Sequence, residues 1–336
     1  ALPKTAHAVR SRLRSRARPP PQSRPAQDRP ASVRAFACIV CLIVFWSPLA
    51  NAASAAVRQH NVLVLYANGR LLPANVEGDR AIAEAFSARA DLSVTLSSEF
   101  LDSPHFGGQA YERAMADFLR EKYAAAPPEV IMAGGEEALD FWLRHRDKIF
   151  PGVPIVHVGV SVAWLQQVLP LPPGVIGIPI DQDEVGTIEQ ALRWHPAARR
   201  LVFVTGASSW DRQWEDRLRA LSTEFAGRLA VEFLVGLPID ELQQRLRDLP
   251  ADAIVYTPGL FADGSGRTFL PREVVRLVAA ASAAPVYGSF STHLGTGIIG
   301  GRTTGYDAMG HRGADIVLAL LDGAAPAALA LPAVMP

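Results

Sequence analysis

From Asn61 onward, short runs of β-branched and other apolar residues alternate with longer amphipathic segments. The runs expected to be strands are Val62 to Tyr66, Leu92 to Leu96, Val130 to Ala133, Ile155 to Val160, Leu201 to Thr205, Leu229 to Leu234, Ile254 to Tyr256 and Val286 to Tyr287. Each is almost continuously apolar, as is typical of a strand buried on both faces. This alternation predicts an α/β fold with parallel sheets flanked by helices on both sides.

Between these runs, apolar residues recur at the three- and four-residue spacing of a helix face. The clearest sets are Tyr111, Met115, Phe118 and Leu119; Trp214, Leu218, Leu221 and Phe225; and Leu242, Leu246 and Leu249. Pro271 stands where a first helical residue tolerates proline, so a helix is expected to begin there.

A chain with eight such strands is larger than one hydrophobic core usually supports, so two lobes are expected. The strongest internal break is the segment Leu169 to Asp183, where prolines and glycines interrupt the alternation. It leaves four strand–helix units on each side.

The formal net charge of zero hides two different segments. Residues 1–52 contain nine Lys and Arg but a single acidic residue, Asp28, so the remainder of the chain carries an equal negative excess. A basic flank, the uncharged run Ala35 to Trp46 and the Ala50-Asn51-Ala52 site together predict a secretory signal. The alternative is an uncleaved membrane anchor through residues 35–50. Either way, we expect a periplasmic location.

Both cysteines, Cys38 and Cys41, lie in the predicted signal, so no disulfide or thiolate metal site is expected after its removal. The eight histidines show none of the spacings of zinc-binding motifs, and no phosphate-binding loop of the Walker type is present. We therefore expect no metal and no cofactor. The negative charge of the exported part also argues against nucleic-acid binding.

Small, hydroxylated or aromatic residues follow the predicted strands, at the ends where open parallel sheets bind ligands. The candidate ligand-binding residues are Tyr66, Asn68, Glu136 and Ser161 in the first half, and Thr205, Ser208, Trp210, Tyr256 and Ser289 in the second. Trp210 or Tyr256 would stack on the ligand, the hydroxyls and Asn68 would hydrogen-bond it, and Glu136 could pair with an ammonium group. Such residues also occur as ordinary turn and cap residues, and Ser208 could simply cap the following helix.

Two segments of the sequence resemble enzyme motifs. Gly159, Ser161 and Ala163 resemble a nucleophile elbow, with Asp252 and His293 following in the required order, so a serine hydrolase using Ser161 is a minor alternative. The string from Gly295 to Gly300 matches GxGxxG, with Asp315 twenty residues after Gly295. Because Ile298 and Ile299 look like a strand themselves, a dinucleotide site is not favoured. We expect a binding module without enzymatic activity.

Three strings carry a family resemblance: FPGVPIVHVGVS (Phe150 to Ser161), ADAIVYTPGLFADGSGRTFLP (Ala251 to Pro271) and APVYGSFSTHLGTGIIGGRTTGYDAMGHRGADIVLALLDG (Ala284 to Gly323). In order, they resemble the ABC-transporter substrate-binding family of type I periplasmic binding proteins. More narrowly, they resemble the branch that forms the extracytoplasmic sensor regions of membrane histidine kinases.

The resemblance implies two Rossmann-like lobes joined by a hinge, with a ligand held between them. Lobe one would comprise residues 57–178 plus 290–332, and lobe two residues 179–289. It also implies either an ABC permease or a histidine-kinase transmembrane and transmitter module as partner. The chain starts on alanine and stops at Pro336 without a transmitter region, so we expect either a free binding protein or a truncated sensor domain.

Overall fold

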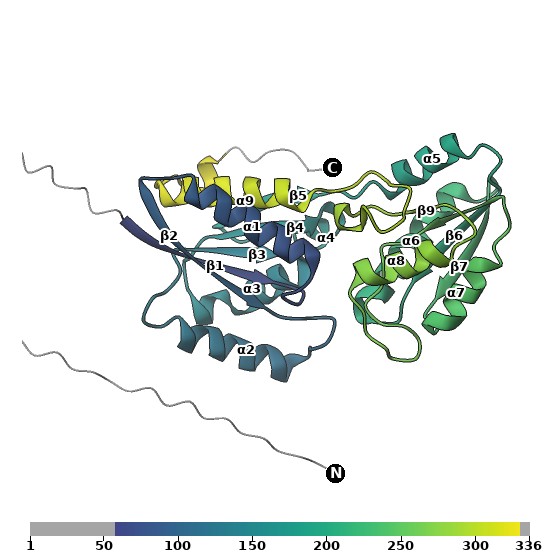
Figure 1. Cartoon of the computed structure of the whole chain (residues 1–336). Coiled ribbons are helices and arrows are strands. Elements are labelled where there is room, and N and C mark those ends of the chain that lie inside the picture. Colours follow the sequence, from purple (N-terminus) through teal and green to yellow (C-terminus); the bar gives the residue numbers. More distant parts are fainter. Residues whose placement is uncertain (1–57, 330–336) are drawn as a thin grey trace, which may run out of the picture. The chain divides into compact units, whose positions relative to one another are not determined.

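The computed structural model describes residues 58–329, which form two parallel sheets (Figure 1). The first has the strand order β2-β1-β3-β4-β5 and the second β7-β6-β8-β9. The strands are β1 (Arg58–Tyr66), β2 (Leu92–Phe100), β3 (Val130–Gly134), β4 (Ile155–Ser161), β5 (Val175–Ile180), β6 (Arg200–Thr205), β7 (Ala230–Val235), β8 (Ala253–Tyr256) and β9 (Val286–Tyr287). The predicted leader and signal segment, with both cysteines, lies outside the described residues.

Helices cover both faces of each sheet, as the alternating sequence pattern predicts. They are α1 (Pro73–Ser87), α2 (Gln109–Lys122), α3 (Glu136–Ile149), α4 (Val162–Val168), α5 (Glu184–Trp194), α6 (Ser209–Ser222), α7 (Ile239–Arg247), α8 (Pro271–Ala281) and α9 (Tyr306–Leu321). On the first sheet, α1 and α9 lie side by side on one face, and α2 and α3 cover the other (Figure 1). On the second sheet, α7 and α8 pack on one face, and α5 and α6 on the other.

All eight predicted strands are present, and α8 begins at Pro271 as expected. The predicted α/β class with two parallel-sheet lobes is therefore confirmed. We use lobe one for the first sheet with α1–α4 and α9, and lobe two for the second sheet with α5–α8.

One strand was not predicted. β5 lies inside the segment Leu169 to Asp183, whose prolines and glycines predict a break. β5 is the edge strand of its sheet, and an edge tolerates Pro179 because one side of the strand needs no ladder hydrogen bonds. The first sheet therefore extends through Ile180, beyond the expected boundary at residue 178.

The sequence predicts that every strand is buried on both faces, and this is wrong for the edge strands β2 and β7. Both are only partly buried. Ile298 and Ile299 also differ from the prediction, because they lie in no strand. Only Gly300 forms an isolated bridge, with Tyr287.

The chain crosses between the lobes twice within the described residues: after β5 and again before α9. The backbone bonds from Ile299 N to Val286 O and from Thr304 N to Ser289 O keep residues 291–304 on lobe two. The return to lobe one thus comes at α9, later than the predicted position near Phe290. Among residues 58–329, no helix combines the length and hydropathy that crossing a membrane requires.

His157 lies in the middle of β4, is 2% exposed, and its Nδ1 has no partner among the described residues. Burial lowers the pKa of His157 to about 4. In the unfolded chain the imidazole has its ordinary pKa of about 6.5. The unfolded state therefore takes up a proton between these two pH values while the folded state does not.

We predict that His157 reduces the free energy of unfolding as the pH falls from about 6.5 to about 4, by roughly 3 kcal/mol in total. Urea denaturation of His157→Gln across this interval should show a flatter pH dependence than the parent. Gln109→Ala, which replaces an exposed side chain that does not titrate at the start of α2, is the control and should keep the parental slope. Equal slopes for all three proteins would contradict the assignment.

Candidate functional site

A cavity of about 830 Å³ opens at the carboxyl ends of the strands of both sheets. Its lining comes from residues after β1, β3, β4 and β5 in lobe one, and from residues after β6, β8 and β9 in lobe two. In each sheet the strand order reverses at one point, between β1 and β3 in the first sheet and between β6 and β8 in the second. Open α/β sheets bind ligands at such points. The cavity is therefore the candidate site.

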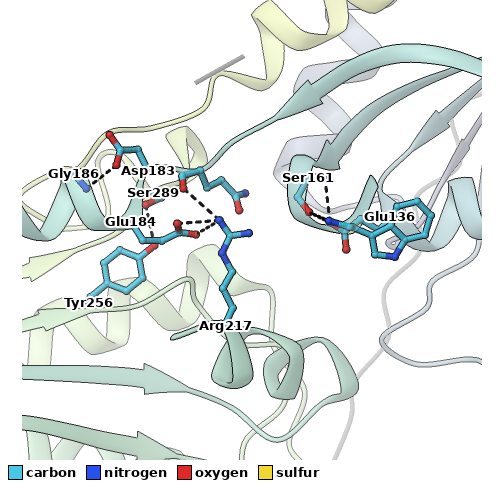
Figure 2. A network of polar contacts seen from close by, with 10 residues as sticks. Glu136, Ser161, Asp183, Glu184, Gly186, Arg217, Tyr256 and Ser289 are labelled. Atoms are coloured by element: carbon cyan, nitrogen blue, oxygen red, sulfur yellow. Dashed lines mark hydrogen bonds and ion pairs between the residues drawn. The ribbon is translucent and has the colours of Figure 1, made fainter. Parts of the chain in front are cut away.

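Glu136 and Ser161 form one part of the lobe-one wall (Figure 2). Ser161 ends β4 and caps α4, where its Oγ accepts a hydrogen bond from Trp164 N at 3.1 Å. The same hydroxyl donates to Glu136 Oε1 at 2.5 Å, and Ser161 N donates to that oxygen at 3.2 Å. These contacts fix the Glu136 carboxylate at the start of α3, beside the cavity.

Tyr66 and Asn68 line the cavity after β1. The Tyr66 ring lies against Gly134, where a Cβ would come within 2.5 Å of the ring, and it stacks on Phe100 at 5.5 Å. Its hydroxyl donates to Asp79 Oδ1 at 2.8 Å, and burial together with Asp79 raises the pKa of Tyr66. The Asn68 carbonyl accepts from Asn75 Nδ2, which orders this turn.

Lobe two supplies an aromatic wall of Trp210, Trp214, Phe261 and Phe290, which continues onto Tyr306 at the start of α9. Trp210 meets Phe261 edge-on at 5.0 Å, and Trp214 meets Phe290 edge-on at 5.6 Å. Edge-to-face contacts of this kind hold the rings in fixed orientations. The wall is therefore an ordered aromatic surface, of a kind on which a flat or apolar group can pack.

Asp211 positions part of this wall from within the protein. It is fully buried, and its carboxylate accepts from Phe261 N at 3.0 Å, Ala262 N at 3.2 Å and Ser208 N at 2.8 Å. It thereby ties the start of α6 to the loop after β8. Trp210 and Phe261 lie on these two segments, so the hydrogen bonds of Asp211 hold the two rings in contact.

Arg217 is the only guanidinium among the described residues that line the cavity. Its Nη2 lies 2.8 Å from the Glu184 carboxylate and donates to the Gln182 carbonyl at 3.3 Å (Figure 2). The guanidinium also stacks over Trp214 at 5.3 Å. Burial raises the pKa of Glu184, and Arg217 acts against that effect. The pair links α6 to the segment that leaves lobe one.

Five of the nine predicted residues line the cavity: Tyr66, Asn68, Glu136, Ser161 and Trp210. The other four lie outside its lining. Ser208 caps α6 in a capping box with Asp211, and Thr205 is buried within β6. Tyr256 and Ser289 are fully buried and bonded to each other at 2.8 Å, so Tyr256 packs in the core instead of presenting its ring to the cavity.

Sequence reasoning missed several lining residues, including Trp214, Arg217, Phe261, Phe290 and Tyr306. A signal for two of them was present, because Trp210, Gln213, Trp214 and Arg217 follow the i, i+3, i+4, i+7 spacing of one helix face. The rings of Phe261, Phe290 and Tyr306 lie on loops or at a helix start, where no periodicity marks them.

The Ser161 hydroxyl is engaged as a helix cap and as a donor to Glu136, and no bond from it to a histidine is formed within residues 58–329. His293 lines the cavity and is buried; burial and Arg272 lower its pKa to about 4, so it is neutral near pH 7. No cluster of three or more potential metal ligands occurs in the part of the chain that the structure describes.

No family model matches the chain, and no curated protein matches it significantly by sequence. Solved structures do match over most of its length. The ABC domain from Streptococcus pneumoniae in complex with L-Trp gives a TM-score of 0.57 at 11% identity, over 83% of this chain and 90% of that one. An ABC transporter solute-binding protein from Bacillus halodurans with bound myo-inositol gives 0.53 at 12% identity, over 84% and 94%.

A periplasmic ribose ABC transporter protein from Conexibacter woesei gives a TM-score of 0.51 at 14% identity, over 84% of this chain and 91% of that one. At such identities the likeness concerns the fold alone. The chain thus has the α/β architecture of type I periplasmic binding proteins, as the sequence resemblance implied. The sensor-kinase branch stays a prediction.

We predict that Asp211→Ala lowers the free energy of unfolding by about 3 kcal/mol, because buried backbone N–H groups lose a charged acceptor and α6 loses part of its cap. Urea denaturation followed by far-ultraviolet circular dichroism measures the change. Asp240→Asn, an exposed acidic residue in the first turn of α7, is the control and should cost only a few tenths of a kcal/mol. A loss no larger than the control's would contradict the role of Asp211.

Proposed function

We propose that the chain is an exported solute-binding protein that captures a small polar or aromatic ligand in the cavity between its two lobes. The observation that carries the proposal is the cavity itself, because it gathers the carboxyl ends of both sheets around one space. Its lining combines aromatic rings with a few fixed polar groups, as small-molecule sites do. The structurally similar proteins from Streptococcus pneumoniae and Bacillus halodurans, with bound L-Trp and myo-inositol, support a role in ligand capture.

Binding would be accompanied by hinge closure at the two crossings between the lobes. A ligand that contacts Glu136 and Ser161 on one side and Trp210 on the other gains its full set of contacts only when the lobes meet. Such differential contacts select the closed state. The Arg217–Glu184 pair lies next to one crossing and would keep that segment attached to lobe two during the motion.

The partner of the ligand-bound form would be either an ABC permease or the transmembrane and transmitter module of a histidine kinase. Both roles place the domain in the periplasm, and the predicted signal in residues 1–52 supports export. Genomic sequence beyond Pro336, or a neighbouring permease gene, would distinguish the two roles.

A thermal-shift screen of amino acids, amines, organic acids, sugars and nucleosides tests ligand capture. A ligand at 100 times its dissociation constant adds about 2.7 kcal/mol to the free energy of unfolding, so a true ligand should raise the melting temperature clearly. The absence of any shift across all of these classes would contradict the proposal.

For a ligand found in this way, we predict that Trp210→Ala weakens binding about tenfold or more, because the ligand loses an aromatic surface held by Phe261. Isothermal titration calorimetry gives the affinity. Trp194→Ala removes a tryptophan that is 55% exposed and lies outside the cavity lining, so it should leave affinity unchanged. Equal affinities for both variants would mean that the ligand binds elsewhere.

A further inference from the structure

The charged residues around the cavity are unevenly distributed. Four carboxylates line it: Glu136, Glu137 and Asp140 from the first two turns of α3, and Asp216 from α6. Asp140 is paired with Arg144 at 2.7 Å. Among the ion pairs formed within residues 58–329, none includes Glu136 or Glu137. Burial, Glu136 and Asp140 raise the pKa of Glu137, as expected of a carboxylate without a cationic neighbour.

Few positively charged side chains line the cavity. No lysine lines the cavity within the described residues, and the one lining guanidinium, Arg217, is already neutralised by the buried Glu184. His293 adds no charge near neutral pH, and its buried Nδ1 has no partner in the described part of the chain, so the ring adds only polar hydrogen-bonding capacity. Among the residues that the structure describes, a ligand carboxylate would therefore meet several carboxylates and no free cation.

The aromatic wall belongs mainly to lobe two, whereas three of the four carboxylates belong to lobe one. A ligand that fits both would have an aromatic ring at one end and a positive charge at the other. A protonated amine is attracted both to carboxylates and to the faces of tryptophan and tyrosine rings. The aromatic wall can therefore also lie close to the ammonium group of the ligand.

We propose that the ligand is an arylalkylammonium ion, an aromatic ring joined by a short chain to a protonated amine, with no carboxylate of its own. Its ring packs against Trp210 and its ammonium group binds Glu136 and Glu137. This inference rests on the proposed function and narrows it to one chemical class.

The acidic residues at the start of α3 have a simpler role as well. Carboxylates in the first turn stabilise a helix through its dipole. That role explains the presence of Glu136 and Glu137 in the first turn of α3, but it does not require their side chains to line the cavity. The helix dipole does not explain why these carboxylates line the cavity. Nor does it explain why Arg217, the one guanidinium among the described lining residues, is neutralised by the buried Glu184.

Three compounds with the same ring and side-chain length separate the possibilities in calorimetric titrations of the full chain: tryptamine, L-tryptophan and indole-3-propionate. They carry a positive, a zwitterionic and a negative side chain. We expect tryptamine to bind about tenfold or more tightly than L-tryptophan, a difference of about 1.4 kcal/mol, and indole-3-propionate not to bind measurably. Tryptamine affinity should also fall with added salt.

Glu136→Gln should weaken tryptamine binding about tenfold or more, because it removes the charge and keeps an oxygen that can accept from Ser161. Glu137→Gln provides a second variant of the same kind, should the first fail to fold. Glu121→Gln changes the net charge equally at an exposed position on α2, and should bind tryptamine like the parent.

Equal or tighter binding of L-tryptophan or indole-3-propionate would overturn the ammonium assignment, as would failure of all three compounds to bind. An unchanged affinity in folded Glu136→Gln and Glu137→Gln would also overturn it. In each case, a sugar or nucleoside hit in the thermal-shift screen would leave solute capture intact, whereas an empty screen would defeat both proposals.

Discussion

Parallel strand pairing is the constraint on which the rest of this structure depends. All strands of a parallel sheet end at the same edge, so the segments after them are gathered in one place regardless of their distance in sequence. Both sheets here are wholly parallel, and the segments after seven of the nine strands line the cavity. The hydrophobic layers on both faces of each sheet make this arrangement rigid enough to hold side chains at fixed positions.

Buried carboxylates then order the loops that the sheets bring together. Asp211 accepts hydrogen bonds from three backbone N–H groups. Asp263, in the loop after β8, accepts from Ser265 N and Arg267 N of the same loop and from Ile239 N at the start of α7. In a poorly polarisable interior, such bonds are strong and their loss is costly, so each carboxylate specifies one loop conformation. Glu136 is different: its hydrogen bonds to Ser161 hold it in place, but no residue in the described part of the chain forms an ion pair with it. The same type of group thus orders loops at Asp211 and Asp263, and at Glu136 lines the cavity without an ion pair among the described residues.

More of the residues predicted in lobe one than of those predicted in lobe two line the cavity. Tyr66, Asn68, Glu136 and Ser161 directly follow or end strands, and all line the cavity. In lobe two only Trp210 does so. Ser208 and Glu136 both stand at the start of a helix, Ser208 as the N-cap of α6 and Glu136 as the first residue of α3, but the Ser208 hydroxyl is used by the helix backbone. Residues that cap helices and residues that bind ligands are of the same types at the same positions, so sequence position alone does not distinguish them.

By itself, the sequence determined the α/β class, eight of the nine strands and the sheet edge at which the cavity-lining loops gather, because these depend on hydrophobic periodicity and on the geometry of parallel strands. It missed β5, whose proline, Pro179, is compatible with an edge position that the sequence does not reveal. Tertiary structure decided which side chains face the cavity. The contact of Asp211 with Phe261 spans 50 residues and that of Tyr256 with Ser289 spans 33. Such long-range packing turns one ring toward the site and another into the core, and no local pattern records it.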